Sequence, residues 1–211
     1  MSTAREVNVI GAGGHAKVVI STLRAAGWQV TGVYDDQPSL QGSLVLDVPV
    51  VGPIAAIREQ AGRPAIIAIG QNAVRRRISR EYSLHWVTAI HPRACVDPTA
   101  VIEPGAVIFA GAIIQPCVRV GIHAIVNTAA TVDHDCVLEP FVQLAPGVHL
   151  SGQVSVGEGA FLGTGSSTIQ RVKIGAWAVV GAGAVVIRDL AEGVTAVGVP
   201  ARVIPRKEKG V

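Results

Sequence analysis

Aliphatic residues recur at every sixth position through nearly half of the chain. From Val96 to Ala191 the sequence divides, without insertion, into 16 blocks of six residues. The first position is Val, Ile or Leu in 15 blocks, with Thr168 as the exception, and the fifth is Ala in eight blocks and Val in five. A period of six does not fit an α-helix, and helices do not tolerate Gly and Pro at this density. The pattern therefore predicts a repetitive β-structure.

Blocks of six residues fit a coil of three short strands joined by tight corners, with 18 residues in each turn. Successive turns of such a coil stack at the ordinary strand spacing of ~4.8 Å. The aliphatic first position would fill the interior, and the small fifth position would fit near a corner. This signature is typical of left-handed parallel β-helices, an exception to right-handed crossovers. A β-sandwich, the alternative, would need alternation and variable loops. We expect an all-β left-handed β-helix with a C-terminal tail over residues 93–211.

Residues 1–92 carry a different pattern, in which short apolar strands alternate with helices. We expect strands over residues 7–10, 30–34 and 66–69, a helix over residues 16–26, and a second helix that ends at Arg80. This alternation indicates a Rossmann-like α/β domain with a small parallel sheet and nucleotide-binding character. The sequence thus predicts two domains, residues 1–92 and residues 93–211.

A glycine-rich turn from Gly11 to His15 lies between the first predicted strand and helix. Such a turn lets backbone amides approach a phosphate at a helix N-terminus, although this one lacks the third glycine of the GxGxxG fingerprint. Asp35 and Asp36 end the second predicted strand, where a ribose or base would be recognised. A polar turn without a ligand is the alternative for the two aspartates, as is a helix N-terminal residue for His15.

The composition narrows the class of partner. Only eight residues are aromatic, so Val, Ile, Leu and Ala must fill the core. The net charge is +3, and much of the excess lies in residues 75–77 and 202–209 rather than in a long basic stripe. Nucleic-acid binding is therefore not indicated, whereas phosphates and other small anions remain suitable partners.

The three cysteines, Cys95, Cys117 and Cys136, form no CxxC pair. An odd number without this spacing predicts buried free thiols in a reducing compartment, not a disulfide framework or a zinc cluster. The chain shows no signal peptide, and no apolar run approaches ~18–20 residues. We expect a cytoplasmic protein with no membrane insertion.

The repeat also places candidate catalytic groups. His134 is the third residue of its block, and Gly152 is the third residue of the block one full turn later, 18 positions on. The two should stack on one corner, about one strand spacing apart. A neutral imidazole is suited to accept a proton near neutral pH, and a neighbouring carboxylate can orient it. Asp135 is the favoured partner of His134, with Asp133 as a less favoured one.

Several segments together resemble one known family: GAGGHAK in the glycine turn, YDD, IGQN, NTAATVDHD, the hexads and the closing GVPAR. They resemble the bacterial sugar O-/N-acetyltransferases related to sialic acid O-acetyltransferases. The resemblance implies a homotrimer with acetyl-CoA bound between neighbouring β-helices and a nucleotide held by the N-terminal domain. It favours N-acetylation of a UDP-, dTDP- or GDP-linked 4-amino-4,6-dideoxysugar without a metal; O-acetylation of sialic acid is the alternative.

The resemblance also assigns roles to residues. His134 would be the general base with Asp135 as its acidic partner, and Gly152 would supply an oxyanion amide. The expected substrate-binding residues are Gly13, Gly14, His15, Asp35, Asp36, Gly70, Gln71, Asn72, Asn127 and Gln143. The expected coenzyme A contacts are Gly152, Thr164, Ala182, Pro200 and Arg202, with Lys207 as an alternative to Arg202. Thr164 and Ala182 are also 18 residues apart, on a different corner from His134.

Some positions leave alternatives open. Gln143 stands where many members of the family have a second histidine, and a glutamine cannot shuttle a proton. A trimeric γ-type carbonic anhydrase would need three histidines around a metal, but His123, His134 and His149 occupy different block positions, and we expect His123 and His149 to be exposed corner residues. A non-catalytic nucleotide-sugar-binding scaffold is a third possibility, which the His134–Asp135 pair disfavours.

Overall fold

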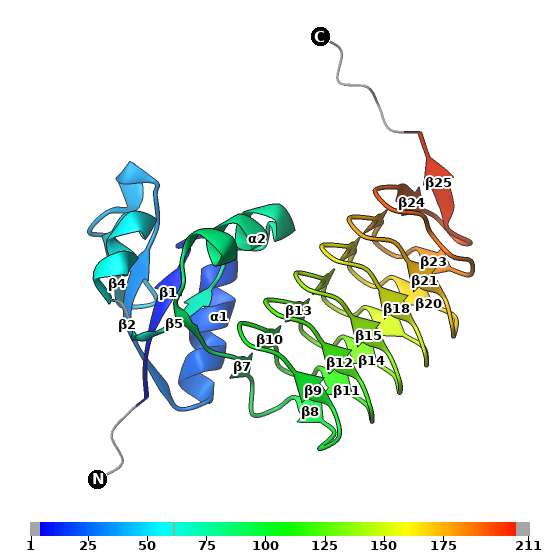
Figure 1. Ribbon diagram of the computed structural model, residues 1–211, viewed down its shortest axis with the longest axis horizontal. Coiled ribbons are helices and arrows are strands. Elements are labelled where there is room, and N and C mark those ends of the chain that lie inside the picture. The colour runs from blue at the N-terminus through cyan, green and yellow to red at the C-terminus, as the bar shows by residue number, and fades with distance from the viewer. Residues whose placement is uncertain (1–4, 61, 206–211) are drawn as a thin grey trace.

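The computed structural model describes residues 5–60 and 62–205, which form an α/β unit followed by a long coil of short strands (Figure 1). The sheet of the α/β unit has the order β3-β4-β2-β1-β5-β6, and every pair in it is parallel except β3 with β4. Its elements are β1 (Arg5–Ile10), α1 (Gly14–Ala25), β2 (Trp28–Tyr34), the 3₁₀ helix η1 (Pro38–Leu40), β3 (Leu44–Val45), β4 (Val48–Gly52), the 3₁₀ helix η2 (Ile54–Gln60), β5 (Pro64–Ile67), α2 (Asn72–Glu81) and β6 (His85–Trp86).

The predicted parallel sheet and both predicted helices are present, with shifted ends. Helix α1 begins at Gly14, two residues earlier than expected, so His15 belongs to its first turn. Strand β5 ends at Ile67 and not at Ile69. The hairpin of β3 and β4 was not predicted, because strands of two and five residues that contain Pro49 carry little periodic signal.

The coil has three faces. The first face contains β7 (Ala89–Ile90), β10 (Val107–Ile108), β13 (Ile125–Val126), β16 (Gln143–Leu144), β19 (Phe161–Leu162) and β22 (Val179–Val180). The second face contains β8 (Cys95–Val96), β11 (Ile113–Ile114), β14 (Thr131–Val132), β17 (His149–Leu150), β20 (Ser167–Thr168) and β23 (Val185–Val186). The third face contains β9 (Val101–Ile102), β12 (Arg119–Val120), β15 (Val137–Leu138), β18 (Ser155–Val156) and β21 (Lys173–Ile174).

The predicted six-residue repeat is confirmed by this arrangement. Strands on one face pair in parallel with partners 18 residues away, as in Thr131 with His149. The first and fifth positions of the blocks fill a continuous core of small aliphatic side chains. At the corners the fourth position adopts a left-handed backbone, for example at Asp135 (φ 59°) and Trp177 (φ 57°). The fold is therefore a left-handed parallel β-helix, as expected.

The ends of the coil differ from the simple repeat. Strand β7 already pairs with β10 on the first face, so the coil begins one block before Val96. After β23 the six-residue spacing ends, and β24 (Thr195–Val197) pairs with β22 and with the antiparallel β25 (Arg202–Ile204). Since β25 covers the last strand of the first face, it blunts an exposed sheet edge.

The α/β unit lies against the first coils of the β-helix (Figure 1). Its core continues into the first face, where Val107, Phe109 and Ile125 join the buried side chains of β1 and α1. Helix α2 lies across the corner between the third and first faces and bonds to the coil backbone through Asn72 and Arg75. The two units therefore share a packed interface.

Two expectations about burial were wrong. His123 is not an exposed corner residue: its side chain is 2% exposed, because Trp86 packs edge-on against the ring at 4.9 Å and Phe141 stacks on it at 5.6 Å. The cysteines are not all buried either, since Cys95 and Cys117 are exposed and only Cys136 lies in the core. Cys95 lies in β8 on the second face, and Cys117 occupies a left-handed position on the corner between the second and third faces.

A search of the described ranges finds no helix with the length and apolar character needed to cross a membrane.

Candidate active site

His134, Asp135 and Gly152 lie together on the corner between the second and third faces. Nδ1 of His134 is 2.8 Å from Oδ2 of Asp135, so in the neutral ring Nδ1–H donates to the carboxylate and Nε2 keeps its lone pair. Gly152 occupies the next coil directly beside the ring, and a Cβ at this glycine would lie 2.6 Å from Nε2 of His134. The predicted stacking of these residues is thus present; their catalytic roles stay predictions.

The electrostatics favour a charged imidazole at this corner. The hydrogen bond to Asp135 raises the pKa of His134 above its ordinary value, and the negative charges of Asp133 and Asp135 act in the same direction. The His134 side chain is 54% exposed and that of Asp135 51% exposed, so solvent screens this pair. The imidazole is therefore a stronger base than an isolated histidine while remaining open to a ligand.

A shallow pocket of about 440 Å³ opens beside His134 and is lined by Gly152 together with polar side chains. Its other lining residues are Asp133, Ser151, Gln153, Gln170 and Arg171. The backbone N–H of Gly152 donates no hydrogen bond within residues 5–60 and 62–205. A free amide next to a base is what the oxyanion of an acyl transfer requires.

The glycine turn and the acidic pair meet at the carboxyl ends of β1 and β2. Oδ2 of Asp35 accepts a 2.7 Å hydrogen bond from the N–H of Ala12, and Oδ1 of Asp36 accepts one of 2.9 Å from Ile54. Both aspartates therefore organise loops. Gly13 and Gly14 are exposed, and α1 has no side-chain cap and no acidic residue in its first turn. The N–H groups of Gly14 and His15 therefore remain available to an anion, whereas that of Ala16 donates to the Gly13 carbonyl at 3.1 Å.

His15 points away from solvent, toward the β-helix. Its ring meets Phe109 edge-on at 5.5 Å, and Nε2 is buried without a hydrogen-bond partner. Burial, together with the positive charge of Arg75, lowers the pKa of His15 to about 4. The ring is thus neutral at physiological pH, and its buried Nε2 can serve a ligand only from inside the interface between the two units.

The loop from Gly70 to Asn72 leads from β5 into α2. Gln71 is exposed, whereas the Asn72 amide nitrogen donates to the carbonyl oxygens of Gly159 and Ala160 at 3.0 and 3.3 Å. Asn72 therefore binds the backbone of the β-helix. Of the predicted loop, Gln71 remains free to face a substrate, whereas the Gly70 carbonyl accepts a 2.9 Å hydrogen bond from Arg75.

The residues expected at coenzyme A occupy another corner, between the first and second faces. Thr164 and Ala182 are exposed there on adjacent coils, and the Thr164 carbonyl accepts a 2.8 Å hydrogen bond from Gly183. Pro200 follows a cis peptide bond near the end of the coil, and Arg202 is exposed in β25. Lys207 lies outside the described residues.

The two remaining predicted substrate residues are also remote from His134 within one protomer. Asn127 lies on the same corner as Thr164, where its Oδ1 accepts a 2.8 Å bond from Thr128. Gln143 is half-buried on the outer side of β16, on the first face. His134 lies across the second face from Asn127, and Gln143 lies on the face opposite the His134 corner. The structure thus brings His134, Asp135 and Gly152 together in one protomer, and it separates them from the predicted nucleotide residues and from the other predicted coenzyme residues.

The three histidines that a carbonic anhydrase would need do not converge. His123 is buried under Trp86 on the corner between the third and first faces, His134 lies on the corner between the second and third faces, and His149 is exposed in β17. His149 instead pairs with Thr131 at 2.8 Å. Within one protomer these positions give no three-histidine metal site, which disfavours the carbonic anhydrase alternative.

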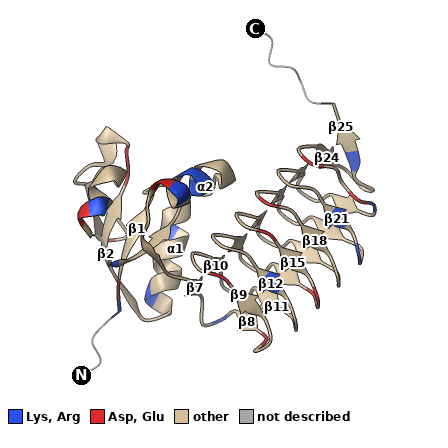
Figure 2. Ribbon diagram, viewed as in Figure 1, with Lys and Arg blue, Asp and Glu red and all other residues tan. Residues whose placement is uncertain are grey.

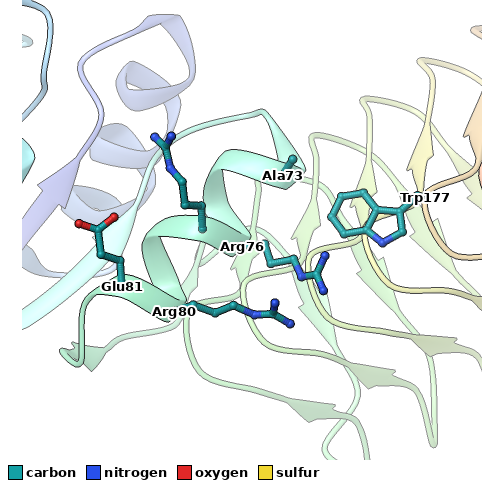
Figure 3. Close-up of a pocket in the computed structure, with 6 residues that line it drawn as sticks. Ala73, Arg76, Arg80, Glu81 and Trp177 are labelled. Carbon is teal, nitrogen blue, oxygen red and sulfur yellow. The ribbon is translucent and has the colours of Figure 1, made fainter.

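Sequence reasoning missed the basic face of α2, on which Figure 2 shows basic residues concentrated. A pocket of about 720 Å³ lies between this helix and Trp177 (Figure 3). In it the Arg76 guanidinium sits 5.2 Å from the Trp177 ring centre and 2.8 Å from Glu158. The triplet of arginines could have signalled a basic helix face, but no sequence pattern reveals which arginine is buried.

Comparisons with known proteins agree with this architecture. Residues 6–82 match the PglD N-terminal domain family. The chain is 44% identical to the GDP-perosamine N-acetyltransferase from Caulobacter crescentus, solved as a histidine-to-alanine variant in complex with CoA and GDP-perosamine, with a TM-score of 0.89 over 95% of this chain and 97% of that one. It is 37% identical to the acetyltransferase domain of PglB from Neisseria gonorrhoeae, solved in complex with acetyl coenzyme A, with a TM-score of 0.90 over 96% and 100%.

A curated relative gives the same indication over a shorter span. The chain is 33% identical, over 109 residues, to the GDP-perosamine N-acetyltransferase from Escherichia coli O157:H7, which is 50% of this chain and 49% of that protein. The matches span about half or less of the length of the curated relatives. The near-complete coverage of solved structures and the matching coil confirm the resemblance: the chain belongs to the bacterial sugar acetyltransferases of the hexapeptide-repeat superfamily.

Proposed function

We propose that this chain transfers the acetyl group of acetyl-CoA to the amino group of a nucleotide-linked 4-amino-4,6-dideoxysugar, with His134 as general base. The observation that carries the proposal is the pairing of His134 with Asp135 at 2.8 Å beside the bare backbone of Gly152. The GDP-perosamine N-acetyltransferases, similar at 44% and 33% identity, favour an amine acceptor and a GDP-linked sugar.

The chemistry follows from the free Nε2 of His134. The sugar amine attacks the thioester carbonyl while Nε2 takes its proton, and the imidazolium that forms is stabilised by Asp135. The negative charge that develops on the carbonyl oxygen is met by the N–H of Gly152. When the tetrahedral intermediate collapses, the CoA sulfur leaves and recovers the proton from His134. No covalent acyl-enzyme is needed, and none of the proposed steps uses a metal ion.

We further propose that the protein is a homotrimer whose active sites lie between subunits. In one protomer the base lies on one corner, the expected coenzyme residues Thr164 and Ala182 on another, and the nucleotide loops beside the first face. The β-helix of a neighbouring subunit would complete the site. Exposed aliphatic side chains around the base fit such a contact, because Ile113, Ile169 and Ile187 are 38%, 43% and 36% exposed.

The expected roles of the glycine turn, Asp35, Gly70 and Gln71 in nucleotide binding remain part of this proposal. So do the domain division at residues 92 and 93 and a cytoplasmic location, which fits a reaction that consumes acetyl-CoA and exposed thiols that are not paired.

The test is a mass-spectrometric assay of the purified protein with acetyl-CoA and a panel of UDP-, dTDP- and GDP-linked 4-amino sugars, with CMP-sialic acid as the O-acetylation alternative. We expect acetylation of one 4-amino sugar, with the mass increase on its amine. His134→Ala is expected to lower kcat by roughly 10²–10⁴-fold while thermal shifts with CoA and nucleotide persist. Product from sialic acid alone, or full turnover without His134, would overturn the proposal. Sedimentation of a monomer at micromolar concentration would contradict the shared site.

A further inference from the structure

Arg75 is a cation buried inside the interface between the two units. Its side chain is 1% exposed, and within residues 5–60 and 62–205 no carboxylate forms an ion pair with it. Burial lowers the pKa of Arg75 to about 9, so the guanidinium is still charged at neutral pH. Burying a charge costs several kcal/mol unless its donors are satisfied. Its hydrogen bonds must therefore offset this cost.

The contacts of Arg75 are all with backbone carbonyls, and they join three segments. Nη1 donates to Ile69 and Gly70 at 3.1 and 2.9 Å. Nε donates to His123 at 3.1 Å, and Nη2 donates to Phe141 at 3.0 Å. His123 and Phe141 are 18 residues apart, so the guanidinium spans two successive coils of the β-helix. Its other two bonds fasten the loop between β5 and α2.

The loop between β5 and α2 is part of the expected nucleotide site, and Arg75 lies against its buried side. The two carbonyls of Ile69 and Gly70 immediately precede Gln71, the exposed residue of the loop. The charge of Arg75 also acts on His15, in the neighbouring glycine turn. The loop from Ile69 to Gln71 is therefore fastened to the β-helix by one guanidinium, and the charge of the same guanidinium acts on His15 at the start of α1.

We propose that Arg75 is a positioning residue. It fixes the position of the nucleotide-binding loop relative to the coils of the β-helix, and this places the acceptor amine next to the acetyl donor. This inference rests on the proposed function. Displacing reacting atoms by about 1 Å costs on the order of 10²-fold in rate. Asn72 assists from the first turn of α2 by bonding Gly159 and Ala160, one coil further on.

Only arginine can make these contacts. Four of its five N–H donors are used in a planar fork, whereas lysine has three donors on a single nitrogen and cannot reach carbonyls on both sides. Lysine in place of Arg75 would keep the charge but release either the loop or the coils. Methionine would keep much of the volume and remove the charge and every bond.

The experiment compares Arg75→Lys and Arg75→Met with Arg77→Lys and Arg77→Met. Arg77 is exposed on the same helix and makes no ion pair within the described part of the chain. Steady-state kinetics give kcat and KM for each substrate, thermal unfolding gives stability, and hydrogen exchange reports on residues 69–72 without substrates. The proton resonances of His15 give its pKa.

We expect Arg75→Lys to raise KM for the sugar roughly tenfold or more, with KM for acetyl-CoA within about twofold. Exchange at residues 69–72 should accelerate, and the pKa of His15 should rise in Arg75→Met because a nearby positive charge is lost. The Arg77 variants should match the wild type in every measurement. Equal changes in both KM values, or unchanged exchange at residues 69–72, would overturn the positioning role. Because exchange and the His15 titration need no turnover, failure of wild-type acetylation would refute the proposed function and leave this inference separately testable.

Discussion

Gly152→Ala is a direct test of the contact between the proposed base and its neighbouring coil. The added Cβ would lie 2.6 Å from Nε2 and 2.7 Å from Cε1 of His134, against about 3.4 Å for the shortest ordinary contacts. The imidazole must therefore retreat by roughly 0.8 Å. It can do so because the His134 side chain is 54% exposed, but the retreat breaks its 2.8 Å bond to Asp135. We expect stability to change little.

Catalysis should respond strongly to the same change. A displacement of this size is expected to lower kcat on the order of 10²-fold, or about 2.7 kcal/mol. Product formation should be followed by chromatography, since the exposed Cys95 and Cys117 would react with thiol reagents used to detect CoA. Gly52→Ala is the control, because its Cβ would meet Ala56 at an ordinary 3.5 Å.

A second measurement distinguishes displacement of the ring from a blocked pocket. The bond to Asp135 raises the pKa of His134, so a displaced ring should titrate at lower pH in the Gly152→Ala protein. Nuclear magnetic resonance of the ligand-free protein gives this pKa directly. A reduced kcat with an unchanged pKa of His134 would refute the reasoning, as would full activity.

Two further predictions concern pH. Asp135→Asn removes the carboxylate that raises the pKa of His134, so the acidic limb of kcat/KM should move to lower pH while the maximum falls by roughly tenfold or more; a limb that stays in place would contradict the pairing. Burial and the charge of Arg75 lower the pKa of His15 and of His123 from 6.5 to about 4. Because these two histidines bind fewer protons in the folded protein than in the unfolded chain, their contribution to stability should be constant above pH 6.5 and fall by up to about 3 kcal/mol per histidine as the pH drops toward 4, which urea unfolding at pH 7 and pH 5 would measure.

The β-helix was predictable because the same core packing repeats along a single axis. Each block places its first and fifth residues in the core, so a single period encodes the strands, their pairing and the stacking of Gly152 on His134. The ends were less predictable. The first coil, at β7, precedes Val96, and the last strand pairs follow a broken spacing, since end strands pair on one side only and tolerate departures from the repeat.

The interface between the two units was not predictable from pattern. His123 carries the polarity of an exposed corner residue, yet Trp86 and Phe141 enclose it. The arginine triplet reads as surface charge, although Arg75 is buried and Arg77 exposed. In both cases the burial of the side chain depends on which residues from a distant part of the chain pack against it. A sequence period contains no information about these tertiary contacts.

Within one protomer the proposed base and the loops expected to bind the nucleotide lie far apart, and they are held in place by different contacts. The coil fixes His134 relative to Gly152 by strand pairing, which leaves little freedom along the axis. The loop between β5 and α2, in contrast, is tied to the coil through α2, by Arg75 and Asn72 on three successive corner segments at residues 123, 141 and 159. If a neighbouring subunit supplies the base, then the distance between the acceptor amine and the base depends on two joints: the interface between the subunits and the interface between α2 and the β-helix. Changes at either joint should therefore affect sugar binding and turnover before they affect the fold of the coil, which needs neither joint to bury its core.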